Sequence, residues 1–215
     1  MSEIQGVLWD MDGVLVDTGK AHFESWRQVL VEHGVPFGRE QFQATFGMNN
    51  AGILRVLISE DIKSEEIQVI GDRKEELFRQ AVKGNARLLP GVLEWLIRLK
   101  SQSLPQAVAS SAPQANIDAL VGELNLEGYF KAIVSGASMP GKPSPDVFLE
   151  AARQIGVPAA NCVVVEDAIA GVQAAHNAGM RCVAVTTTNS ADALAAADIV
   201  VDRLDGLSEE AFFSL

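Results

Sequence analysis

Two aspartates near the start of the chain, Asp10 and Asp12, are separated by one residue and followed by a glycine. They come directly after the apolar residues 7–9, which predict a short buried strand ending where the acids begin. In open α/β sheets the carboxyl ends of the strands form the crevice where ligands bind, so acids placed there are candidates for chemistry. The same residues would also suit a polar turn after a core strand. The choice between a functional acid pair and a polar turn depends on which other polar residues of the chain would lie beside them.

Two further polar groups follow a predicted strand or lie in a loop. Ser110 and Ser111 come after the apolar residues 107–109. A hydroxyl there can help backbone amides to hold an anionic oxygen, although serine at a strand end is commonly a helix cap. Lys142 lies in a Gly-Lys-Pro-Ser-Pro loop that its prolines stiffen. A fixed cation there would balance a bound phosphate, whereas an ordinary surface lysine needs no such constraint.

The last polar group is a second pair of acids, Glu166 and Asp167, which follows the apolar residues 162–165. With Asp10, these acids could supply the hard oxygen ligands that Mg²⁺ prefers, although acids also serve as caps and in solvated turns. Two acid pairs, a hydroxyl and a lysine at strand ends or in loops together predict a site for phosphoryl transfer.

The elements that must position these residues alternate along the second half of the chain. Apolar runs at 107–109, 132–134, 162–165, 182–185 and 199–201 are separated by helical patterns at 92–100, 116–124, 145–155 and 168–178. Strands that are apolar throughout and joined by helices indicate a parallel sheet covered on both faces. With the first strand, they predict a doubly wound, Rossmann-like α/β fold.

Residues 21–83 show helical patterns only, at 21–33, 39–46, 51–58 and 64–83. A chain of 215 residues is long for one domain and short for two, which favours a main domain with a smaller insertion. We therefore divide the chain into an α/β core, residues 1–16 and 86–215, and an all-helical insert, residues 17–85.

The charge of the chain argues against polyanionic partners. A net charge of -11 and a pI near 4.7 would repel nucleic acid and anionic membrane, so an anionic substrate would need a local cation or metal. The two cysteines, Cys162 and Cys182, each begin an apolar run, which indicates buried thiols rather than a disulfide or a metal site. We find no signal-peptide pattern and no apolar stretch long enough to cross a bilayer, and we expect a cytoplasmic monomer.

In the order and separation of its four motifs, the chain resembles the haloacid dehalogenase superfamily, in the branch of phosphatases and phosphomutases that carry a helical cap after the first motif. The motifs are Asp10-Met11-Asp12-Gly13-Val14, Ser110, Lys142 in Gly-Lys-Pro-Ser-Pro-Asp, and Glu166-Asp167. The resemblance implies that Asp10 is the nucleophile and Asp12 the general acid and base. It also implies a Mg²⁺ ion held by the Asp10 carboxylate, the Asp12 main-chain carbonyl and Asp167, with Glu166 as a nearer or outer ligand.

These implied roles agree with the chemistry of the residues. A carboxylate nucleophile can form an aspartyl-phosphate, which divides a difficult displacement into two easier ones. Mg²⁺, Lys142, Ser110 and loop amides, with Ser111 beside them, would stabilise the transferring phosphoryl group. Asp12 distinguishes this chain from the dehalogenase and phosphonate hydrolase branches, which it resembles less because they have another residue there. A phosphate ester is therefore the expected substrate class.

The predicted insert should select the ester. His22 is similar to a histidine at the start of the cap in the β-phosphoglucomutase branch, although a lone helical histidine is also common as a packed residue. That branch uses a cap arginine to bind a second phosphate. Residues 46–52, at the matching place in this chain, contain no arginine; Arg55 could replace it or face water. Asn49 and Asn50 could bind substrate hydroxyls or cap a helix. We expect a Mg²⁺-dependent phosphatase for a small phosphorylated metabolite such as a sugar phosphate; the alternatives are a β-phosphoglucomutase-like sugar phosphomutase and a non-catalytic phospholigand-binding protein.

Overall fold

The computed structural model describes residues 3–215, and its core is a six-stranded, all-parallel sheet in the order β3-β2-β1-β4-β5-β6. The strands are β1 (Gly6–Trp9), β2 (Gln106–Ser110), β3 (Ala132–Ser135), β4 (Cys162–Glu166), β5 (Arg181–Val185) and β6 (Ile199–Val201). The first strand of the chain lies in the middle, between β2 and β4. The predicted doubly wound α/β fold is confirmed.

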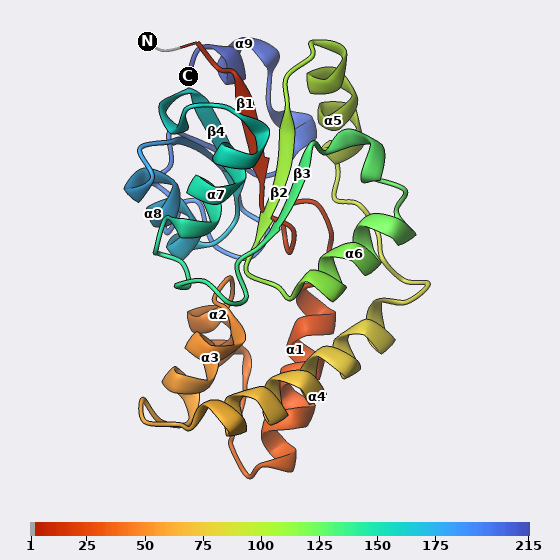
Figure 1. Cartoon of the computed structure of the whole chain (residues 1–215), viewed down its shortest axis with the longest axis vertical. Coiled ribbons are helices and arrows are strands. Elements are labelled where there is room, and N and C mark those ends of the chain that lie inside the picture. Colours follow the sequence, from red (N-terminus) through yellow and green to blue (C-terminus); the bar gives the residue numbers. More distant parts are fainter. Residues whose placement is uncertain (1–2) are drawn as a thin grey trace.

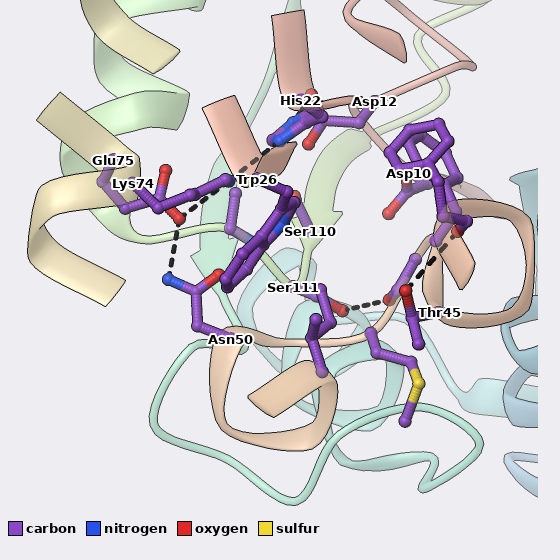
Figure 2. Close-up of a pocket in the computed structure, with 16 residues that line it drawn as sticks. Asp10, Asp12, His22, Trp26, Thr45, Asn50, Lys74, Glu75, Ser110 and Ser111 are labelled. Carbon is purple, nitrogen blue, oxygen red and sulfur yellow. Dashed lines mark hydrogen bonds and ion pairs between the residues drawn. The ribbon is translucent and has the colours of Figure 1, made fainter. Parts of the chain in front are cut away.

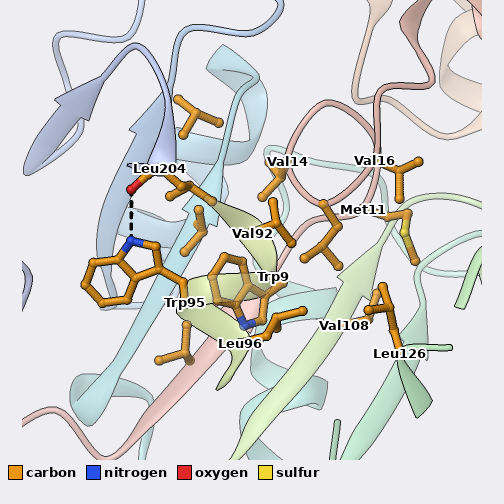
Figure 3. Close-up of a cluster of buried hydrophobic side chains, with 14 of the residues drawn as sticks. Trp9, Met11, Val14, Val16, Val92, Trp95, Leu96, Val108, Leu126 and Leu204 are labelled. Atoms are coloured by element: carbon orange, nitrogen blue, oxygen red, sulfur yellow. Dashed lines mark hydrogen bonds between the residues drawn. The ribbon is translucent and has the colours of Figure 1, made fainter. Parts of the chain in front are cut away.

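Alternate residues of the strands point to opposite faces of the sheet, and each face is covered by helices (Figure 1). On one face, Val7 and Trp9 pack with α5 (Val92–Ser101), α6 (Gln114–Glu123) and α9 (Glu209–Phe213). In this cluster the Trp95 indole of α5 donates to the carbonyl of Leu204 at 2.9 Å (Figure 3). On the other face, Leu8 packs with α7 (Asp146–Ile155) and α8 (Ile169–Asn177). The two cysteines are free and buried, as predicted.

Four helices form a separate layer below the carboxyl ends of the strands in Figure 1: α1 (Gly19–Glu32), α2 (Arg39–Thr45), α3 (Asn50–Leu57) and α4 (Ser64–Val82). They surround an apolar cluster of their own that includes Trp26, Leu54 and Ile70. The last turns of α4 differ, because Phe78 and Val82 belong to the apolar cluster of the core. We call these four helices the cap.

The chain passes between core and cap twice, and the two passages run side by side. The amide of Asp17 donates to the carbonyl of Arg87 at 3.1 Å, and the amide of Leu89 donates to the carbonyl of Leu15 at 3.1 Å. Both linkers therefore meet the cap at one place, where a hinge would act. No helix within residues 3–215 is long and apolar enough to cross a membrane.

Candidate active site

The register of the parallel sheet brings the sequence motifs together. Trp9 pairs with Val108 on β2 and with Val165 on β4. Asp10, the first residue after β1, therefore lies beside Ser110, the last residue of β2, and Glu166, the last residue of β4. All three side chains are buried. The predicted convergence follows from the sheet, since the carboxyl ends of parallel strands lie along one edge.

Lys142 lies between two of the acids. Its ammonium group is 2.5 Å from Asp10 Oδ1 and 2.6 Å from Glu166 Oε1, and its side chain is almost completely buried. Although burial disfavours a charged lysine, the two carboxylates raise the pKa of Lys142 above its usual value. The other Glu166 oxygen accepts from the amides of Asp167 and Ala168, at 2.7 and 2.8 Å. Both Glu166 oxygens thus have protein partners, an arrangement that holds Lys142 in place.

Asp10 and Asp167 form a crowded pair of buried acids. Burial raises the pKa of Asp10 to about 7. Lys142 stabilises the ionised carboxylate, but repulsion from Glu166 and Asp12 offsets part of this effect. Burial and the charges of Glu166 and Asp10 also raise the pKa of Asp167. Acids in this situation lack positive charge, which a bound cation would supply.

The donor set suits Mg²⁺. Asp10 and Asp167 offer carboxylate oxygens, the main chain at Asp12 offers a carbonyl, and Mg²⁺ commonly completes its coordination with water and substrate phosphate. Within residues 3–215 no group of three or more His, Cys, Asp or Glu side chains forms a metal-binding cluster, and this donor set has two carboxylates and one main-chain carbonyl. The Asp167 carboxylate occupies space that a Cβ at Gly13 would fill, 2.0 Å from Oδ2, and Thr188 donates to the same oxygen at 2.6 Å.

Asp12 has different partners, one of which comes from the cap. The hydroxyl of Thr18 donates to Asp12 Oδ1 at 2.6 Å, and His22 Nε2 lies 3.0 Å from the same oxygen. Burial opposes ionisation of Asp12, but the contacts with His22 and Thr18 hold its pKa below the ordinary value. His22 is buried and stacks on Phe78, with ring centroids 4.1 Å apart. The structure therefore places His22 beside the predicted acid and base.

Lys74 and Glu75 are site residues that the sequence did not reveal. Lys74 Nζ is 2.9 Å from His22 Nδ1 and donates to Glu75 Oε1 at 2.9 Å, and Asn50 donates to the same Glu75 oxygen at 2.7 Å (Figure 2). Both charged side chains are buried. Lys74 lies four residues from Ile70 and from Phe78, on the buried face of α4, and this spacing was the available signal.

Two of the predicted binding residues have other partners, and a third lies outside the pocket. Asn49 caps α3, because its Oδ1 accepts from the amide of Gly52 at 2.9 Å, while its Nδ2 donates to the carbonyl of Met139 in the core. Ser111 donates to the carbonyl of Gly47 in the cap at 2.9 Å, so its hydroxyl contacts the cap. Arg55, which the sequence left either to replace the missing arginine or to face water, is exposed and does not line the pocket.

A pocket lies between the two aspartates and the cap. Its core side includes Asp10, Asp12 and Ser110 (Figure 2). The rest of the lining includes apolar side chains, Trp26, Phe42, Phe46, Met48 and Ile53, and polar ones, His22, Thr45, Asn50, Lys74 and Glu75. A ligand here would contact both charged groups and apolar side chains.

The model of the family described as "Haloacid dehalogenase-like hydrolase" matches residues 7–185, which include all four motifs. The chain therefore belongs to this family of hydrolases. Its relatives place it in the branch of phosphatases and phosphomutases, as the motifs predict.

Two bacterial relatives match this chain over most of their own length. β-Phosphoglucomutase of Bacillus subtilis is 30% identical over 96% of this chain and 93% of the relative, and fructose-1-phosphate phosphatase YqaB of Escherichia coli is 33% identical over 84% and 95%. Protein SUPPRESSOR OF QUENCHING 1, chloroplastic, of Arabidopsis thaliana is 38% identical over 87% of this chain, which spans only 18% of that protein. The crystal structure of β-phosphoglucomutase from Clostridium difficile is 26% identical, with a TM-score of 0.88 over 97% of this chain and 95% of that one.

Proposed function

We propose that the protein is a Mg²⁺-dependent phosphatase that hydrolyses the monophosphate ester of a small uncharged metabolite, such as a sugar. The observation that carries this proposal is the pair of aspartates with unlike partners. Asp10 is held by Lys142 at the end of β1, and Asp12, two residues further on, is held by Thr18 and by His22 of the cap. Such a pair can divide nucleophilic and proton-transfer work between two carboxylates.

In the first step, the Asp10 carboxylate attacks phosphorus and the bond to the ester oxygen breaks, leaving an aspartyl-phosphate on Asp10. Asp12, which carries the proton taken from water in the second step of the preceding turnover, donates it to the departing oxygen. In the second step, Asp12 takes a proton from water, which attacks the same phosphorus and releases inorganic phosphate and Asp10. Lys142 pairs with Asp10, so its positive charge lies beside the carboxylate that receives the phosphoryl group.

Mg²⁺, when bound, would neutralise phosphate charge and orient the phosphoryl group toward Asp10. We assign its protein ligands to the carboxylates of Asp10 and Asp167 and the carbonyl of Asp12. Glu166 acts through Lys142 in this proposal, because both of its oxygens already have protein partners.

The charges of the pocket favour a phosphatase over a mutase. Within residues 3–215, the cap side of the pocket is lined by one lysine and no arginine, and Lys74 is already shared by Glu75 and His22. A bisphosphate would bring a second dianion to this side, which includes the Glu75 carboxylate. A neutral leaving group with an apolar face suits the lining better.

The test is phosphate release from a panel of sugar and polyol monophosphates with and without Mg²⁺, for the wild type and for Asp10→Asn. We expect turnover only with Mg²⁺ and its loss in Asp10→Asn, whose circular dichroism stays unchanged. Asp17→Asn is the matched control, because Asp17 is exposed. Normal turnover by Asp10→Asn would refute the nucleophile.

The same panel separates the other candidate functions. A mutase would interconvert sugar phosphates when primed with a bisphosphate and release little free phosphate. A phospholigand-binding protein would bind members of the panel, measured by calorimetry, without turning over any of them.

A further inference from the structure

A polar side chain of the core, Asn116, contacts the cap outside the four motifs. Asn116 lies on α6 and is 1% exposed. Its Nδ2 donates to Glu75 Oε2 at 2.5 Å, and its Oδ1 accepts from Arg79 Nη1 at 2.9 Å. Glu75 and Arg79 are one turn apart on α4. Both ends of one buried amide are therefore used to hold one face of a cap helix against the core.

These contacts continue as far as the predicted acid and base. The other Glu75 oxygen accepts from Lys74, and Lys74 contacts His22, which lies 3.0 Å from Asp12. The connected side chains start in the core at Asn116, run through the cap and return to the core at Asp12. A change at Asn116 can thus reach Asp12 through direct contacts only.

Apolar packing alone would not orient α4 in the same way. Phe78 and Val82 already attach the helix to the core cluster, but apolar contacts are non-directional. Hydrogen bonds to Glu75 and Arg79 require a particular rotation of α4 about its axis, since misaligned bonds weaken steeply. If the rotation changed, the Glu75 carboxylate would lose a buried partner, which is unfavourable.

We infer that Asn116 is a positioning residue for the reaction: it fixes the rotation of α4 on the core, so that Lys74 and His22 meet Asp12 when the cap is closed. The catalytic consequence rests on the proposed function. The structural consequence, a cap orientation set by Asn116, does not depend on it.

The kinetic test is a double-mutant cycle. Asn116→Asp keeps the size of the side chain and the acceptor for Arg79 but places a carboxylate against Glu75. Glu75→Gln alone places an amide opposite the Asn116 amide, and the two amides cannot both satisfy their hydrogen-bond partners. In the double variant, the amide introduced on α4 donates to the carboxylate introduced on α6, so the hydrogen bond returns with its direction reversed. The carbonyl of the introduced amide still accepts from Lys74, and the two new side chains carry the same total charge as the original pair.

We expect each single variant to lower kcat by about tenfold with little change in KM, and the double variant to recover at least several-fold of the loss caused by Asn116→Asp. Asp118→Asn is the matched control, because Asp118 is exposed on the same helix and pairs only with the exposed Gln114 in the described hydrogen bonds. A double variant no better than Asn116→Asp would overturn the inference.

The structural test measures the cap directly. Spin labels at Val69→Cys on α4 and Leu149→Cys on α7 are attached at exposed positions, and the two native thiols are buried. Asn116→Asp should broaden the distribution of label distances, and the double variant should narrow it again. An unchanged distribution in Asn116→Asp overturns the inference. If the wild type hydrolyses no ester, the proposed function fails, and the distance distributions alone decide the role of Asn116.

Discussion

The substitution Gly13→Ala should weaken activation by Mg²⁺ while leaving the protein folded. Gly13 has φ +84°, in the left-handed region, so any L-residue there costs about 1–2 kcal/mol. A Cβ at this position would also lie 2.0 Å from Asp167 Oδ2 and 2.8 Å from its Cγ. Since non-bonded heavy atoms settle at roughly 3.5–4 Å, the carboxylate must move by about 1 Å or more. Mg²⁺ requires oxygen ligands at about 2.0–2.1 Å in nearly ideal octahedral geometry, so such a displacement would remove the ligand that we propose Asp167 supplies.

Gly179→Ala provides the matched control. Gly179 has φ +72°, and a Cβ there would find no heavy atom within 4 Å. Both variants should therefore lose about 1–2 kcal/mol of stability, equivalent to a melting temperature lower by roughly 2–8 °C for a chain of this length. Only Gly13→Ala should require more Mg²⁺, by about tenfold for the loss of one ligand interaction worth roughly 1.4 kcal/mol.

Two measurements check this prediction. Phosphate release against Mg²⁺ concentration gives the half-saturating concentration, and thermal unfolding with and without Mg²⁺ shows how much the ion stabilises the folded state, independently of turnover. The reasoning is refuted if Gly13→Ala and Gly179→Ala show the same half-saturating concentration and the same Mg²⁺-dependent rise in melting temperature.

Two further predictions concern the residues that hold the lysines. A Cβ at Gly171 would lie 1.8 Å from Glu166 Oε1, so Gly171→Ala should displace Glu166 from Lys142 and lower kcat by roughly tenfold or more. Gly122→Ala is the control, because a Cβ there would lie 3.6 Å from its nearest neighbour. It should leave kcat unchanged in the same assay and stabilise its helix by up to about 1 kcal/mol. Burial opposes ionisation of Glu75, but the adjacent ammonium group lowers its pKa from 4.5, so its charge stabilises the fold above pH 4.5 and this contribution is lost as pH falls through the lowered value. The stability difference between wild type and Glu75→Gln, measured by urea unfolding, should therefore shrink on acidification below about pH 4.5; a difference that stays constant there would contradict the assignment.

The positions of three of the four motifs could be predicted because a parallel sheet imposes them. Apolar runs identify strands, strands joined by helices run parallel, and parallel strands end at one edge. Asp10, Ser110 and Glu166 therefore had to lie close together once the runs before them were recognised as strands. The helix bounds were predicted within about two residues, for example 64–83 against the observed Ser64–Val82.

The cap contacts could not be predicted in this way, because they depend on how two helices rotate against each other. Local sequence could not separate Asn49 from Asn50, yet the first caps α3 while the second reaches Glu75 on another helix. Glu75 and Asn116 are 41 residues apart, and helical spacing does not report such contacts. The short helix α9 (Glu209–Phe213) was also not predicted, since five residues carry little periodicity.

The two buried lysines of the site explain why the core and the cap depend on each other. Lys142 has two carboxylate partners, which raise its pKa in spite of burial, so the core keeps one cation by itself. Burial lowers the pKa of Lys74, and its one carboxylate partner is Glu75, within the described residues. The Glu75 carboxylate in turn is held by Asn50 of the cap and Asn116 of the core. If the cap moved away from the core, Glu75 would lose the Asn116 contact and His22 would be separated from Asp12 in the same motion. The charged side of the pocket is therefore complete only in the closed arrangement, where the ester would be enclosed.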